Sequence, residues 1–124
     1  MLAAPATAAA PRYILVSGPG LANPALLDDW NENLRLEAAI AGSAQLPRAR
    51  YVARPRYDLA LFWNWTEGVV PTRPEAADQH GSFYPAHGRS VAVVVLYVGG
   101  KRVPRQASPD VLRILKRHGV PTRR

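Results

Sequence analysis

The sequence contains no cysteine among its 124 residues. This absence excludes a disulfide scaffold, a zinc or iron–sulfur site with thiolate ligands, and a thiol nucleophile. Long apolar stretches are missing too, because the longest run, residues 91–98, has eight residues, whereas a membrane-spanning helix needs about 20. The sequence therefore predicts no transmembrane helix and no membrane partner, and we expect a cytoplasmic protein.

Acidic residues are scarce. Nine Asp and Glu stand against 16 Lys and Arg, which gives a formal net charge of +7. The excess lies in the second part of the chain, because residues 47–124 hold 14 basic and five acidic residues, whereas residues 1–46 hold two and four. A basic surface of this kind favours anionic partners.

The composition fits one folded domain. With 48% hydrophobic and 20% charged residues, a chain of this length can bury a core but is too short for two domains of usual size. We expect the single domain to span residues 12–121. Residues 1–11 are rich in Ala and Pro and lack the positive start of a secretory signal, so they predict a disordered tail. Residues 122–124 predict a short basic tail.

Local patterns predict strands and helices. Alternating or β-branched runs indicate strands, and Gly99–Gly100 predicts a hairpin turn between two of them. A capping residue followed by proline indicates a helix start at Asn23 and at Ser108. Residues 49–54 are either a separate strand or part of the next ribbon, bent at Pro55. The predicted strands are 12–17, 57–65, 90–98 and 101–105, and the predicted helices are 24–41 and 109–118.

These elements predict an α+β fold with two layers. We expect a mixed sheet of four or five strands under two amphipathic helices, in the order strand, helix, one or two strands, long loop, strand, strand, helix. Strands 12–17 and 57–65 would run parallel, joined across the first helix. At about 100° per residue, this helix would bury one apolar stripe. The stripe consists of Leu26, Leu27, Trp30, Leu34, Ala38 and Ala41.

The arginines predict where an anion would bind. Four of them alternate along residues 48–56 and would project from one face of an extended backbone, where their planar donor groups suit phosphate. Three more basic residues lie on the outer face of the last helix. The alternative explanation is compositional bias, because all but two of the 16 basic residues are arginine. The candidate anion-binding residues are Arg48, Arg50, Arg54, Arg56, Arg113, Lys116 and Arg117.

The connection over residues 66–89 is a second candidate site. Its length exceeds the roughly 12–15 residues that compact domains usually leave without structure or function, and it contains two of the three histidines. In one interpretation His80 is a general base oriented by Asp78 or Glu75, while Tyr84 or Arg89 holds a substrate anion. In the other, Phe83, Tyr84 and Pro85 pack the loop onto the sheet and His80 caps a short helix. Their spacing matches no metal-ligand pattern, so no metal is expected. The candidate pocket residues are Trp65, Asp78, His80, Tyr84, His87 and Arg89.

Together these patterns predict a non-enzymatic basic domain, without a cofactor, that binds a polyanion and foremost nucleic acid. Two alternatives stay open. One is a small-molecule-binding protein or small enzyme that uses the 66–89 connection. The other is a self-assembling subunit, such as a homodimer in which the acidic face of the first helix meets the basic region of a second copy.

Overall fold

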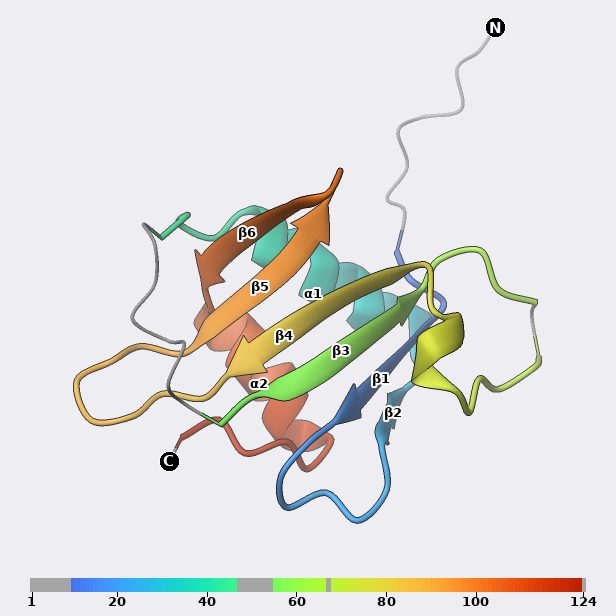
Figure 1. The fold of residues 1–124 in the computed structure, drawn as a ribbon, viewed down its shortest axis with the longest axis horizontal. Helices are drawn as coiled ribbons and strands as arrows, with labels where there is room; N and C mark the ends of the chain where they lie inside the picture. Colours follow the sequence, from blue (N-terminus) through green and yellow to red (C-terminus); the bar gives the residue numbers. More distant parts are fainter. Residues whose placement is uncertain (1–9, 47–54, 67, 124) are drawn as a thin grey trace, which may run out of the picture.

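A six-stranded antiparallel sheet carries both helices on one of its faces (Figure 1). The computed structural model describes residues 10–46, 55–66 and 68–123. The strands lie in the order β2-β1-β3-β4-β5-β6, which confirms the predicted α+β class. The elements are β1 (Tyr13–Ser17), β2 (Ala25–Leu27), α1 (Trp30–Ala41), β3 (Tyr57–Phe62), the 3-10 turn η1 (Pro74–Ala76), β4 (Gln79–Tyr84), β5 (Val93–Val98), β6 (Lys101–Gln106) and α2 (Pro109–Arg117).

The main hydrophobic core lies between the sheet and the helix layer. Alternate strand residues point toward the helices, and the register aligns Val16 with Leu59 and Leu59 with Gly81 across neighbouring strands. We call this side of the sheet the helix face and the other side the open face. Removing these aliphatic side chains from water is the main source of stability for the two layers. The core includes Ile14, Val16, Leu59, Leu61, Phe83 and Val94 from the sheet, with Leu36, Ile40, Val111, Ile114 and Leu115 from the helices.

The buried amide of Asn33 joins α1 to the first two strands. Asn33 is fully buried, and its Nδ2 donates to the carbonyl oxygens of Pro11 and Leu27, both at 3.1 Å. These carbonyls lie just before β1 and at the end of β2. These bonds satisfy the N–H groups of the amide and fix how the helix begins over the sheet, whereas the buried Asn33 Oδ1 has no hydrogen-bond partner among the described residues.

The predicted helix over 24–41 is wrong in its first turns. Residues 25–27 form β2, which pairs antiparallel with β1, and α1 begins at Trp30 with Asp29 as its cap, where Asp29 Oδ1 accepts from the backbone N–H of Glu32 at 3.0 Å. Pairing with β1 outweighs the local helix signal at Asn23 because it satisfies backbone groups that a frayed helix end leaves open.

The change of helix start also changes the face that α1 buries. Trp30, predicted to be inside, is 45% exposed. The residues that α1 buries are Glu32, Asn33, Leu36 and Ile40.

The predicted 66–89 loop contains a central strand. Residues 79–84 form β4, which pairs with β3 on one side and β5 on the other. The segment has few β-branched or alternating apolar residues, so strand periodicity did not reveal it. The sheet therefore has six strands instead of four or five, it is antiparallel throughout instead of mixed, and β1 and β3 are antiparallel neighbours.

The predicted β5–β6 hairpin and the predicted last helix are confirmed. Gly99 and Gly100 have φ angles of 56° and 80°, as the two-residue hairpin turn requires. The Ser108 hydroxyl accepts from the backbone N–H of Val111 at 3.4 Å at the start of α2. Capping and turn residues set these boundaries locally, so sequence alone located them.

Both ends of the described chain are in contact with the folded domain. Ala10 and Pro11, assigned to the tail by sequence, are buried, and residues 1–9 of that tail lie outside the described residues. Near the other end, the backbone N–H of Ala86 donates to the carbonyl of Thr122 at 3.0 Å. The possible strand at 49–54 also lies outside the described residues.

The outer edge of β6 is partly paired. The N–H of Leu46 donates to the carbonyl of Pro104 at 3.0 Å, and the N–H of Gln106 donates to the carbonyl of Ala44 at 2.9 Å. Among the helices of the described residues, neither is long and apolar enough to cross a bilayer.

Gly81→Ala should destabilise the fold, because a Cβ at this position would lie 2.6 Å from Leu96 Cδ2 and 2.6 Å from the carbonyl oxygen of Val95. We expect a loss of about 1–3 kcal/mol in unfolding free energy, as for overpacked core sites. Urea denaturation measures it. The control is Gly42→Ala, where the nearest atom is 3.3 Å away and φ is −85°, and it should cost less. An equal effect of the two substitutions would contradict this account of β4.

Candidate functional site

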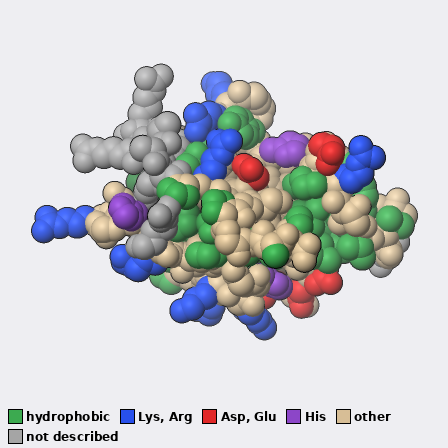
Figure 2. Space-filling view, turned by 60° about the horizontal axis from the view of Figure 1, so that its bottom comes forward, with side chains coloured by type: hydrophobic (Ala, Val, Ile, Leu, Met, Phe, Trp, Pro, Cys, Tyr) green, Lys and Arg blue, Asp and Glu red, His purple; other side chains and the backbone are tan. Residues whose placement is uncertain are grey.

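The predicted basic residues that the structure describes do not all lie on one surface. Arg48, Arg50 and Arg54 lie outside the described residues, and Arg56 directly precedes β3. The other three lie on α2 or its last turn, on the opposite side of the sheet. On the side seen in Figure 2, Lys and Arg side chains lie in several separate groups, with Asp and Glu side chains between some of them.

Two of the α2 cations are paired with carboxylates. Arg113 forms an ion pair with Asp110 on the same helix, and Arg117 Nη1 lies 2.8 Å from Glu32 Oε2. Lys116 is exposed. Helix α2 therefore presents less unpaired positive charge than its sequence indicates.

The candidate pocket residues of the 66–89 segment are spread along the length of β4. Asp78 directly precedes the strand, His80 and Tyr84 lie within it, and His87 is in the turn beyond. Six strand residues span roughly 20 Å, so these side chains do not surround one cavity. No group of three or more potential metal ligands occurs in the part of the chain that the structure describes.

Asp78 and Trp65 stabilise the loop that follows β3. Asp78 Oδ2 accepts from the backbone N–H groups of Trp63 and Asn64 at 2.6 and 3.0 Å. Trp65 packs edge-on against Phe62 with ring centroids 4.9 Å apart, and its Nε1 donates to the carbonyl of Val69 at 2.7 Å. Both side chains are thus engaged in contacts within this loop.

His80, Tyr84 and Arg56 instead lie on the same open face of the sheet, where Arg56 contacts Tyr84. The register pairs Asp58 with Ser82 on neighbouring strands, and residues two positions apart along a strand share its face. Residues directly opposite on paired strands also share a face. We call this group the open-face patch. It comprises Arg56, Asp58, His80, Ser82, Tyr84, Tyr97 and Arg102.

Arg56 is held in place at one side of the patch. A hydrogen bond with Tyr84 and, next, the charge of Asp58 raise the pKa of the Arg56 guanidinium, so it stays charged. Its Nε lies 3.6 Å from Asp58 Oδ1, and both side chains are largely exposed. An exposed pair of this kind contributes little to stability. Tyr84 is buried and therefore acts as the fixed support for an accessible cation.

Tyr97 supplies an accessible aromatic ring beside a second cation. It lies directly opposite Arg102 in the β5–β6 pairing and is 43% exposed. Because Gly81 pairs with Leu96, the next pair in the β4–β5 register places the exposed His80 opposite Tyr97, on the side away from Arg102. Three neighbouring strands thus present an imidazole, a phenol and a guanidinium in one row.

Sequence reasoning missed Tyr97 and Arg102. Tyr97 belongs to the apolar run over residues 91–98, for which the sequence pattern predicts only a strand. A signal for the pair was nevertheless present, because a two-residue turn at Gly99–Gly100 sets these residues opposite each other.

The remainder of the open face is covered. Leu15, Ala60 and Phe62 are buried on this side, with Trp65 and Ala77 packed against them. Ser82, Tyr84, Val93 and Val95 are buried on this face as well, with Leu46 packed against the last three. The accessible side chains of the patch are therefore Arg56 and Asp58 toward one end of the strands and His80, Tyr97 and Arg102 toward the other.

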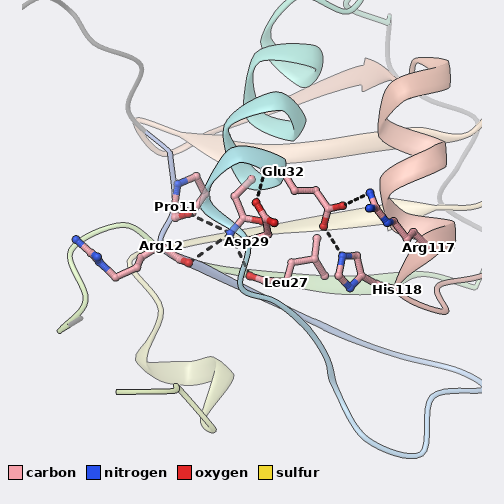
Figure 3. A network of polar contacts seen from close by, with 8 residues as sticks. Pro11, Arg12, Leu27, Asp29, Glu32, Arg117 and His118 are labelled. Atoms are coloured by element: carbon pink, nitrogen blue, oxygen red, sulfur yellow. Dashed lines mark hydrogen bonds and ion pairs between the residues drawn. The ribbon is translucent and has the colours of Figure 1, made fainter. Parts of the chain in front are cut away.

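A separate polar network joins the two helices and is structural (Figure 3). The Glu32 carboxylate, buried in the first turn of α1, accepts from Arg117 Nη1 at 2.8 Å and lies within hydrogen-bond reach of His118 Nε2. Both partners come from the end of α2. The Glu32 carboxylate at the start of α1 and the Arg117 guanidinium at the end of α2 also complement the two helix dipoles. Arg117, which the sequence predicts to bind an external anion, thus binds the Glu32 carboxylate of its own chain.

Comparison with protein-family models, with curated proteins and with solved structures finds no match to this chain.

Glu32→Ala removes the shared acceptor of Arg117 and His118. We expect the free energy of unfolding to fall by about 1.5–3 kcal/mol, the range for hydrogen bonds to a charged group. Arg117→Ala should cost under about 1 kcal/mol, because the Arg117 side chain is 65% exposed. Thermal or urea unfolding of both variants checks the order, and a larger loss for Arg117→Ala would show that the network does not centre on Glu32.

Proposed function

We propose that this protein is a non-enzymatic domain that binds single-stranded nucleic acid across the open-face patch. The observation that carries the proposal is the row formed by His80, Tyr97 and Arg102 on three adjacent strands, in which Tyr97 is 43% exposed. Arg56 adds a second cation to the same face.

The chemistry of the row matches an unpaired nucleotide. The flat ring of Tyr97 offers a stacking surface for a base, which is sequence-tolerant because every base has a π-face. Arg102, beside Tyr97, and Arg56, at the other end of the patch, offer planar donor groups to phosphates of the same nucleic-acid strand. Bases in a duplex are stacked on each other and do not offer their faces to a protein ring. The patch therefore favours single strands over duplexes.

The overall charge supports an anionic ligand. A net charge of +7 attracts a polyanion over long range and raises its association rate. The cations of α2 lie on the other side of the sheet, so they add to this attraction without touching a strand bound to the patch.

Binding rather than catalysis is also favoured by the state of the proton-transfer groups. The phenol of Tyr84 and the carboxylate of Asp58 both interact with Arg56. Their role is thus to hold a cation, which is a positioning role. The proposal needs no cofactor or metal.

Tyr97→Ala should weaken binding of a short fluorescein-labelled oligouridylate about tenfold or more, since stacking on one aromatic contributes about 1–3 kcal/mol. Tyr97→Phe keeps the ring and should bind as the wild type does. Fluorescence anisotropy at low ionic strength measures both, and an unlabelled duplex should compete less well than the same single strand.

Arg102→Ala should weaken binding of all sequences alike and reduce the salt dependence of log K by about 0.7, the loss expected for one phosphate contact on a single strand. Lys116→Ala is the matched control, because it removes one exposed positive charge from α2 on the other side of the sheet. The proposal is overturned if the wild type retains no oligonucleotide at low salt, or if Lys116→Ala weakens binding as much as Arg102→Ala.

A further inference from the structure

A groove on the helix face remains unaccounted for by the nucleic-acid proposal. It runs between the second half of α1 and the β5–β6 hairpin, where the helix layer ends. Its floor and walls are aliphatic, and one acidic and one basic residue line it as well. The residues that define it are Ile40, Leu96, Val98, Val103, Glu37 and Arg105. We call it the α1–β6 groove.

The groove exposes apolar surface that the rest of the fold covers. Leu96 and Val98 lie on the helix face of β5, since they are two positions apart on the strand and Leu96 packs against the main core. Val98, however, is 54% exposed. The apolar run of β5 therefore continues beyond the helices that cover its first half. An apolar strip at the edge of a covered core is typical of a surface that another protein covers.

The charges of the groove are opposite and are not paired with each other. In the part of the chain that the structure describes, Glu37 makes no ion pair, and Arg105 Nη1 donates to the carbonyl of Ser43 at 2.8 Å. Both line the same groove. A surface that holds an apolar strip and both signs of charge is complementary to itself.

We infer that a second copy of this chain covers the α1–β6 groove and forms a two-fold symmetric dimer. In a two-fold interface the same patch is used twice, so Glu37 of each copy meets Arg105 of the other. The exposed Val98 side chains then pack together at the centre. The unpaired Glu37 argues against a polyanion in this groove, because its carboxylate would repel phosphate.

The dimer leaves the open-face patch accessible. The groove is on the helix face and the patch is on the opposite face of the same sheet, so the two copies present their patches away from each other. The inference is therefore independent of the nucleic-acid proposal, and each can fail without the other.

Sedimentation equilibrium of the full chain tests the dimer directly. The wild type should show a concentration-dependent monomer–dimer equilibrium. Glu37→Arg and Arg105→Glu should each raise the dissociation constant about tenfold or more, because each places like charges across the interface. Lys116→Glu, a charge reversal on α2 outside the groove, should leave the dissociation constant unchanged.

An equimolar mixture of Glu37→Arg and Arg105→Glu gives the decisive result. In the mixed dimer both contacts again join opposite charges, whereas within each chain the two residues still carry like charges. Heterodimers should therefore form at concentrations at which each variant alone is largely monomeric. Val98→Asp should abolish dimerisation by charging the apolar centre, and circular dichroism verifies that every variant is folded.

The inference is overturned if the wild type stays monomeric at the highest concentration it reaches in solution. It is also overturned if the folded charge-reversal variants fail to associate when mixed, or if folded Val98→Asp dimerises as the wild type does. Should Arg105→Glu fail to fold because its bond to Ser43 is lost, Glu37→Arg and Val98→Asp still decide the question.

Discussion

The position of the helix layer depends on the buried amide of Asn33. Its hydrogen bonds to the carbonyls of Pro11, Arg12 and Leu27 set the start of α1 against the first two strands. Loss of this buried donor would remove a partner from each of these carbonyls in a largely apolar interior, which is costly. Because α1 extends from this point toward β5 and β6, the same contact also determines how much of the last hairpin the helix covers. The Glu32 carboxylate, one residue earlier, then holds the end of α2 beside α1.

The one-sided helix layer gives the two faces of the sheet different chemistry. On the helix face, aliphatic side chains continue past the end of the cover and leave the α1–β6 groove. On the open face, loop residues cover the β1 and β3 end, and the accessible remainder carries ionisable and aromatic side chains. Strand β5 contributes to both surfaces, since Tyr97 and Val98 are neighbours in sequence and face opposite ways. A single short hairpin therefore supplies residues to both of the proposed binding surfaces.

Sequence alone located the elements whose boundaries are set by adjacent residues. The β5–β6 hairpin follows from two glycines at its turn, and α2 follows from its serine cap and proline. Strands β2 and β4 were missed because both exist through pairing with distant strands, which local periodicity does not report. The candidate site was incompletely predicted for the same reason. The sequence identified Arg56 and His80 in two separate hypotheses, because only the pairing of β3 with β4 places them on one face. Arg117 was assigned to external anion binding because its carboxylate partner, Glu32, lies far away in sequence.

The short outer strands have a consequence for how this chain behaves at high concentration. Strand β2 has three residues, and the other margin of the sheet carries Pro104 and is bonded in part to residues 44–46. Long edge strands with unpaired backbone groups are templates on which further chains can pair into fibrils, and proline or a covering segment at the edge prevents this pairing. A protein with apolar strands at its centre is thereby protected against amyloid-like polymerisation at its sheet edges.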